Sequence, residues 1–321
     1  METDSLSVLS AAAFVLGGLV MLVGGGEALV KGATRLAGRL GMKPLLIGLT
    51  VVAFGTSVPE LFVSMTAAFK GYPDIMIGNV VGSNIANIGL ILGCCALIRP
   101  LALTIGEVWY ELLLVSGGSV LLMLCSGYGF FSRAMGLLFV LTLTGYTILV
   151  CNNTLRNQER EKEKNINRKE AGGGMGLPLM LGLILLGLVL LATGSNLFIR
   201  GAVDLARYFG VSELIIGLTL AAIGTSLPEL ASSLAALRHD ESGLLIGNVI
   251  GSNMFNLFMV LGLTGLLKPF TLSSDLLHRD LPVMLAFTLI LIPILHKSGG
   301  TRRIHGVFLL GGYLLYCLSL V

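Results

Sequence analysis

The sequence predicts an all-α, polytopic membrane protein, and three observations lead to this class. The 321-residue chain is 55% hydrophobic and 12% charged, whereas charged residues make up about a quarter of an ordinary soluble domain. Ten apolar segments are each long enough to cross the ~30 Å hydrocarbon layer as a helix. Their residues lack the alternating pattern of a membrane β-barrel, and an open strand would leave backbone groups unpaired in lipid.

We expect one membrane helix for each apolar segment, and no cleaved signal peptide before the first. The first residues are acidic, so they lack the basic leader that such a peptide carries. The predicted helices cover residues 7–33, 44–69, 75–98, 108–126, 130–151, 177–203, 212–237, 243–267, 276–295 and 304–321.

The strongest change in composition lies at residues 152–176. This stretch contains six basic and four acidic residues and includes three consecutive glycines, Gly172 to Gly174. We interpret it as a solvated linker that is marginally helical at best. It separates an N-terminal five-helix repeat, residues 1–151, from a C-terminal one, residues 177–321.

The two halves contain a duplicated segment. Residues 45–93 return at residues 214–262 without an insertion, and 24 of the 49 positions are identical at a constant offset of 169. Because each half crosses the membrane an odd number of times, we expect the second copy to enter from the opposite face. Inverted repeats of this kind are typical of secondary transporters, whose binding sites lie near the membrane midplane where helices are interrupted.

The distribution of basic residues predicts the orientation. Loops after the odd-numbered predicted helices contain 15 Lys and Arg residues, against 6 on the other side. By the positive-inside rule we expect the linker to be cytoplasmic and both termini to lie outside the inner membrane.

Each copy of the duplicated segment carries one acidic residue directly after a proline, Glu60 after Pro59 and Glu229 after Pro228. A charge in hydrocarbon is retained mainly where it binds something, although protonated packing residues are the alternative. Proline removes one backbone donor and crowds the preceding turn, so both helices should break there. We expect the break to turn freed backbone carbonyls toward an ion. These are the carbonyls of Ala53, Gly55, Thr56, Ala222, Gly224 and Thr225.

The next predicted helix of each copy carries a polar strip. Ser83 and Asn87 are four residues apart and share one helical face, as do Ser252 and Asn256. Carboxylate, amide, hydroxyl and carbonyl oxygens together are ligands for hard cations. We therefore expect the two glutamates and two asparagines to meet at a common centre. Hydrogen bonding between helices or, for serine, to the same helix is the alternative.

These motifs resemble the signatures of the calcium/cation antiporter superfamily, most closely its prokaryotic sodium/calcium exchanger branch. The first copy reads GTSVPE at Gly55–Glu60 and GSNIAN at Gly82–Asn87. The second reads GTSLPE at Gly224–Glu229 and GSNMFN at Gly251–Asn256. The resemblance extends over essentially the whole chain.

The resemblance implies an antiporter that exchanges Na⁺ for Ca²⁺ by alternating access, with four ion sites between the repeats. Glu60 and Glu229 would bridge a central Ca²⁺ site and flanking Na⁺ sites, and Thr56 and Thr225 would add carbonyls to Ca²⁺. One peripheral Na⁺ site would be lined by Ala53, Ser57 and Ser83, and the other by Ala222, Ser226 and Ser252.

The same resemblance bears on coupling. The first and sixth helices would slide to open each face in turn. Asparagine at position 256, where the potassium-dependent branch carries aspartate, argues against coupling to K⁺. The two glutamates carry a charge of −2, which one Ca²⁺ neutralises, while three Na⁺ leave an excess of +1. An electrogenic exchange of about three Na⁺ per Ca²⁺ is consistent with this count.

Two other functions stay open on the sequence alone, a proton/calcium antiporter and a cation channel. An enzyme is disfavoured because the chain lacks a persuasive nucleophile with a base. We expect no cofactor and no nucleic-acid partner, and a monomer in the lipid bilayer. Glu27, whose counterpart is Asn196, either lines an ion vestibule or, as we favour, is a helix-end acid that reaches water.

Overall fold

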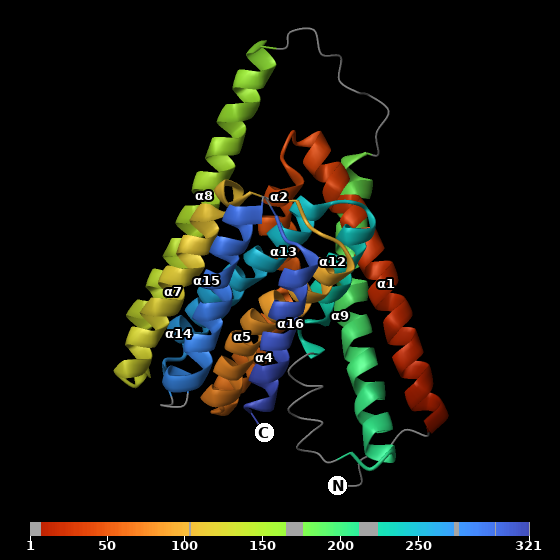
Figure 1. Cartoon of the computed structure of the whole chain (residues 1–321), viewed down its shortest axis with the longest axis vertical. Helices are drawn as coiled ribbons and strands as arrows, with labels where there is room; N and C mark the ends of the chain where they lie inside the picture. The colour runs from red at the N-terminus through yellow and green to blue at the C-terminus, as the bar shows by residue number, and fades with distance from the viewer. Residues whose placement is uncertain are drawn as a thin grey trace.

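The computed structural model describes residues 8–102, 104–164, 176–211, 224–272, 276–298 and 300–320. This part of the chain is mostly helical, as predicted (Figure 1). Its named strands are two short ones, β1 (Phe130–Phe131) and β2 (Phe270–Thr271), which pair antiparallel.

The helices of the first half follow the predicted ranges closely. In chain order they are α1 (Val8–Arg39), α2 (Pro44–Ile47), η1 (Gly48–Val52), α3 (Ala53–Thr56), α4 (Val58–Lys70), α5 (Pro73–Ala86), η2 (Asn87–Leu92), α6 (Gly93–Ile98), η3 (Ile105–Glu107), α7 (Trp109–Gly127) and α8 (Arg133–Lys164). The predicted spans 44–69 and 75–98 each consist of several consecutive helical pieces. They contain the π-helical segments η1 and η2, and π-helical turns often mark functional sites.

The second half repeats this plan. Its helices are α9 (Leu177–Tyr208), α12 (Leu227–Arg238), α13 (Ser242–Met254), η5 (Phe255–Val260), α14 (Leu261–Leu267), η6 (Leu276–Asp280), α15 (Leu281–Ser298) and α16 (Arg303–Leu318). The first part of the predicted helix 212–237, residues 212–223, lies outside the described residues.

Several helices are long and apolar enough to cross a membrane. Within the described residues seven meet this description, and an eighth is added if the bent pair Pro44–Thr56 and Val58–Lys70 forms one span. The last helix, α16, is apolar but shorter. The chain is therefore a multi-pass membrane protein, while the count of ten spans stays a prediction.

The predicted linker begins later than expected, because α8 continues as a helix to Lys164. The expectation that residues 152–176 are at best marginally helical is wrong for this first part. The sequence Glu159–Lys164 alternates acidic and basic residues of high helix propensity, and no glycine or proline occurs between Gly145 and Gly172. A helix that already exists inside the membrane can therefore extend into water.

The two longest apolar helices, α1 and α9, run antiparallel along one side of the molecule (Figure 1). Glycines seven residues apart line their contact, three on each helix. They are Gly18, Gly25 and Gly32 on α1, and Gly187, Gly194 and Gly201 on α9. A Cβ atom at Gly25 would lie 3.0 Å from the Gly187 carbonyl oxygen, so the two backbones touch. Small residues allow this close approach in membranes.

The helices that carry the polar strips lie at the centre of the bundle. The helical stretch Ser242–Leu267 is completely buried along its most apolar window, and Pro73–Ile98 is largely buried. By contrast, only a minority of the residues in the corresponding windows of α1, α8 and α9 are buried, as expected of helices that face lipid.

Connections between helices meet at two opposite ends. At the end where α8 leaves the bundle, here the linker end, Lys43 pairs with Glu107 and Arg99 pairs with Asp240. The Thr301 N–H also donates to the Leu101 carbonyl at 2.8 Å. At the opposite end, β1 pairs with β2. In Figure 1, α1 begins and α16 ends at that opposite end.

We predict that Gly25→Ala lowers thermal stability, because its Cβ would lie 2.9 to 3.0 Å from backbone atoms of α9. Overpacking of this kind costs about 1–3 kcal/mol. The matched control is Gly24→Ala, since a Cβ there meets nothing within 4 Å. Thermal unfolding of the purified protein in detergent measures both. Equal midpoints for the two variants would contradict this packing.

Candidate cation-binding site

A helix break places each glutamate of the duplicated segment at the start of a new helix. The bent pair in the first half turns by 41° between Thr56 and Val58. Pro59 lies at the second position of α4, where its missing N–H breaks no helical hydrogen bond. Glu60 follows in the first turn, close to the partial positive charge of the helix start. The predicted break is confirmed.

The second half repeats this arrangement. The turn residues Thr225 and Ser226 precede α12, Pro228 lies at one of its first two positions, and Glu229 lies in its first turn. Each half thus presents one carboxylate from a newly started helix.

Both carboxylates are completely buried, and neither has a hydrogen-bond partner among the residues that the structure describes. They are close enough to interact electrostatically. A buried anion without a partner is strongly unfavourable, and two such anions repel each other. Bound cations would remove this cost, as would protons on the carboxylates.

Unpaired polar atoms concentrate around these two acids. In the described residues twelve buried side-chain oxygen or nitrogen atoms lack a partner, and nine of them belong to six residues that the sequence singled out. These residues are Ser57, Glu60, Asn87, Ser226, Glu229 and Asn256. Because folded proteins leave few buried polar groups unpaired, such a concentration indicates a ligand site.

The chemistry of the available atoms fits a hard cation. Oxygen atoms of carboxylate, hydroxyl and amide groups dominate the set, and such ligands suit Na⁺ and Ca²⁺. The described part of the chain contains no group of three or more His, Cys, Asp or Glu side chains suited to a metal. The arrangement therefore does not resemble a transition-metal centre.

Two asparagines hold the helix breaks in place. The Asn79 amide donates to the Glu60 backbone carbonyl at 3.4 Å and to the Ser64 hydroxyl at 2.9 Å. The Asn248 amide donates likewise to the Glu229 carbonyl at 3.4 Å and to the Ser233 hydroxyl at 3.1 Å. Asn79 and Asn248 are not among the site residues predicted from the sequence. Their role as supports becomes clear from the contacts, although their recurrence at the same offset was the available signal.

The supports cross between the halves. The Thr56 hydroxyl donates to the Asn248 amide oxygen at 3.2 Å, and the Thr225 hydroxyl donates to the Asn79 amide oxygen at 3.1 Å. Thr225 and Asn248 are the counterparts of Thr56 and Asn79 at the offset of 169 residues, so the duplication relates the two hydrogen bonds. The end of α3, just before α4, is therefore tied to α13, and the turn before α12 is tied to α5.

The serines and asparagines of the polar strips also lie at this junction. Ser252 lies 3.3 Å from Thr56, and Ser83 lies 3.4 Å from Thr225, measured between hydroxyl oxygens. The Asn87 amide nitrogen donates to Asn253 at 2.9 Å, which leaves the Asn87 amide oxygen available. The structure thus brings residues of both repeats together at one place.

The backbone carbonyls are less free than expected. The Gly224 carbonyl accepts a hydrogen bond from the Ser195 hydroxyl at 2.7 Å, so one of its two lone pairs is not freed as we expect from the sequence. The Ala53 carbonyl accepts the Ser57 N–H at 3.0 Å, which leaves only its second lone pair. Ala222 lies outside the described residues.

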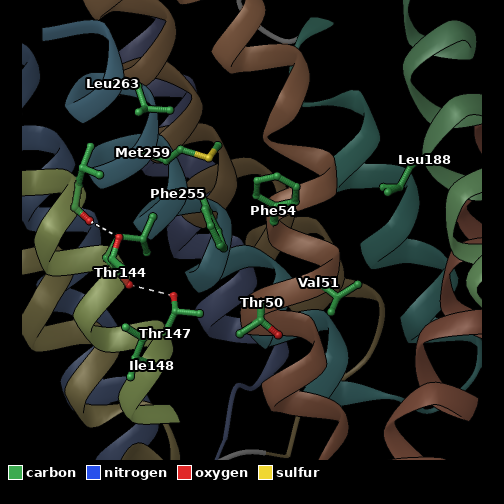
Figure 2. A pocket seen from close by; sticks show the side chains of 12 residues that line it. Thr50, Val51, Phe54, Thr144, Thr147, Ile148, Leu188, Phe255, Met259 and Leu263 are labelled. Carbon is green, nitrogen blue, oxygen red and sulfur yellow. Dashed lines mark hydrogen bonds between the residues drawn. The ribbon is translucent and has the colours of Figure 1, made fainter. Parts of the chain in front are cut away.

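A cavity of about 590 Å³ lies beside the first break, but it is not the ion site (Figure 2). Phe54 faces it and contacts Phe255 edge to face, with ring centroids 5.7 Å apart. The threonines in its wall bond to carbonyls of their own helices, as Thr144 does to Val140 at 2.8 Å. Its walls therefore present mainly carbon, which does not coordinate a cation.

A multi-pass helical bundle with paired acids at interrupted helices is typical of membrane ion transporters. The family model for the sodium/calcium exchanger protein matches residues 10–152 and 179–321, and the chain belongs to this family.

Individual proteins are similar to this chain over nearly its whole length. The inner membrane protein YrbG of Escherichia coli is 37% identical, with 98% of this chain and 97% of YrbG covered. The sodium/calcium exchanger MaX1 of Methanosarcina acetivorans is 32% identical, with 94% and 96% covered. A solved structure of the sodium-calcium exchanger NCX_Mj, soaked with zero Na⁺ and Ca²⁺, is similar with a TM-score of 0.82 at 31% identity, covering 98% of this chain and 100% of that one.

We predict that Asn248→Ala weakens cation binding, because it releases both the start of α12 and the Thr56 hydroxyl. The increase in melting temperature on adding Ca²⁺ should fall by at least half. Asn153→Ala, at an exposed asparagine on α8, is the control and should keep the full increase. An unchanged Ca²⁺ response in Asn248→Ala would show that the site does not need this support.

Proposed function

We propose that this protein exchanges Na⁺ for Ca²⁺ across the inner membrane by alternating access. The observation that carries the proposal is the pair of buried carboxylates without partners, one from each half. Membership of the sodium/calcium exchanger family supports Na⁺ and Ca²⁺ as the ions. The ions are substrates of the cycle, so the site must bind them without holding them permanently.

In this proposal Glu60 and Glu229 bridge a central Ca²⁺ site and the flanking Na⁺ sites. The remaining ligands are Thr56, Thr225, Asn87 and Asn256 near the centre, Ala53, Ser57 and Ser83 on one side, and Ala222, Ser226 and Ser252 on the other. The unpaired oxygens of Ser57, Ser226 and Asn87 support this assignment. The contact of Ser83 with Thr225 also fits a cluster shared by both halves.

We further propose that the halves, residues 1–151 and 177–321, are inverted five-helix repeats joined by the linker. The family model matches the chain in two separate stretches, and the crossed hydrogen bonds recur at the offset of the duplication. The clustering of connections at two ends is consistent with ten spans. By the positive-inside rule the linker end is cytoplasmic and both termini face outward.

We predict that Glu60→Gln and Glu229→Gln each abolish Na⁺-gradient-driven Ca²⁺ uptake into proteoliposomes. Glutamine keeps the size of the side chain but removes the charge that the cations neutralise. Removing one ligand carboxylate should reduce the initial rate more than 100-fold. Radioactive Ca²⁺ uptake into Na⁺-loaded vesicles measures this rate.

A matched control is Glu111→Gln. Glu111 is also a buried acid in a membrane helix, but its carboxylate accepts a hydrogen bond from Tyr146 at 2.6 Å and lies outside the proposed site. This variant should keep most of the uptake. Uptake that follows a pH gradient and ignores Na⁺ would replace the proposal by proton/calcium exchange, and single-channel currents would replace it by a channel.

We predict electrogenic exchange of three Na⁺ for one Ca²⁺, without K⁺ dependence. Because one net positive charge then leaves Na⁺-loaded vesicles per cycle, an inside-positive potential should accelerate Ca²⁺ uptake and an inside-negative potential should slow it. Ca²⁺ uptake rates measured at potentials imposed with valinomycin and K⁺ gradients test this dependence on membrane potential. Rates that ignore the potential would indicate electroneutral exchange of two Na⁺.

A further inference from the structure

Glu27, on α1, is tied to the end of α12. One of its carboxylate oxygens lies 2.6 Å from His239 Nε2, and the other lies 3.7 Å from the Arg238 guanidinium. Contrary to our interpretation, Glu27 is not a helix-end acid, because α1 continues to Arg39. The neighbouring Asp240 is paired with Arg99.

The same two helices are in close backbone contact beside this cluster. A Cβ atom at Gly26 would lie 2.8 Å from the Ala231 carbonyl oxygen and 3.2 Å from Ala235 Cβ. Packing and ion pairing therefore join α1 to α12 along adjacent turns. Together they close the space between the two helices at the linker end.

α12 connects this contact directly with the ion site. Glu229 lies in its first turn, and His239 follows its last residue. A helix of this length spans about 18 Å at 1.5 Å per residue. Movement of α1 against α12 thus acts on the same rigid element that carries one of the two carboxylates.

The corresponding contact in the other half is not formed. The counterparts of α1 and α12 are α9 and α4, and these two do not make a comparable contact. Asn196, at the position of Glu27, donates instead to the Ala192 carbonyl of its own helix at 3.0 Å. Thr66, the counterpart of Ala235, is exposed, whereas Ala235 is 5% exposed.

We propose that the contacts of Glu27 with His239 and Arg238 form a latch that holds the linker end closed in this conformation. The latch must open before ions can leave at that end, so it sets the balance between the two access states. This inference rests on the proposed alternating access. It assigns to Glu27 and His239 a positioning role, since neither belongs to the proposed ion ligands.

The modest strength of the latch suits this role. The Glu27 side chain is 38% exposed, and exposed ion pairs change an equilibrium by no more than about fivefold. A transporter must populate both states, so a much stronger tie would trap one of them. The second half lacks the acid, which biases the resting protein toward closure at the linker end.

The latch is tested with two reporter cysteines in a protein whose five native cysteines are replaced. Ala235→Cys reports opening at the linker end, and Thr66→Cys reports at the opposite end. Both are labelled with a membrane-impermeant maleimide in detergent, without Na⁺ or Ca²⁺. Glu27→Gln should raise the labelling rate at position 235 two- to fivefold and lower the rate at position 66.

His239→Gln should produce a shift in the same direction but no larger, because Arg238 still pairs with Glu27, and the double variant should add little to Glu27→Gln alone. Glu107→Gln is the matched control, since it breaks an ion pair with Lys43 at the same end without touching α12. It should change neither rate. Rates that stay unchanged in Glu27→Gln, or that rise at position 235 alone, would overturn the latch.

The labelling experiment does not depend on the transported ions. If wild-type vesicles fail to exchange Na⁺ for Ca²⁺ but the two labelling rates still shift in opposite directions, the proposed function fails and the latch stands. If exchange is observed and the rates do not shift, only the latch fails.

Discussion

The architecture depends on one constraint, the burial of two carboxylates at membrane depth. Neither carboxylate has a hydrogen-bond partner among the described residues. A single charged side chain at the centre of a membrane helix costs about 2.5–3.5 kcal/mol even on the mildest scale, and two like charges side by side cost more. The fold keeps both Glu60 and Glu229 completely buried. In the proposed function, cations bound between the halves resolve this conflict.

In the proposed exchange cycle, the surroundings of the acids divide into a fixed part and a part that moves. The fixed part is the junction where Asn79 and Asn248 hold the helix breaks and exchange hydrogen bonds with the threonines of the other half. Outside it, α1 and α9 touch through glycines along their length. At the linker end, Gly26 and Glu27 of α1 also contact α12, and α9 makes no comparable contact with α4, which gives the structure a direction.

Much of the fold could be predicted from the sequence because the strongest signals were physical necessities. Apolar segments must be helices in lipid, and prolines before Glu60 and Glu229 must interrupt them, so the helix bounds and breaks were recovered closely. Duplication placed the two acids together before any contact was known. The extension of α8 to Lys164 departs from the prediction, because high charge favours solvent exposure but does not prevent a helix where helix propensity is high and glycine is absent.

Other features depend on contacts between segments that a sequence pattern does not encode. The Ser195 hydroxyl donates a hydrogen bond to the Gly224 carbonyl, although these residues lie on different helices. The counterpart of Ser195 in the first half is Gly26, which has no hydroxyl to donate. The pairing of Glu27 with His239 joins residues 212 apart, and neither residue has the same partner type in the other half. Such differences between copies arise from the conformation as well as from the sequence, and only the three-dimensional structure reveals them.

The most direct test of the central claim is anomalous X-ray diffraction from crystals of this protein soaked in Sr²⁺ as a heavy substitute for Ca²⁺. The account predicts a strong anomalous peak within about 2.3–2.6 Å of carboxylate oxygens from both Glu60 and Glu229, the distance range of calcium ligands. A peak bound elsewhere, or none at a concentration that supports transport, would contradict it.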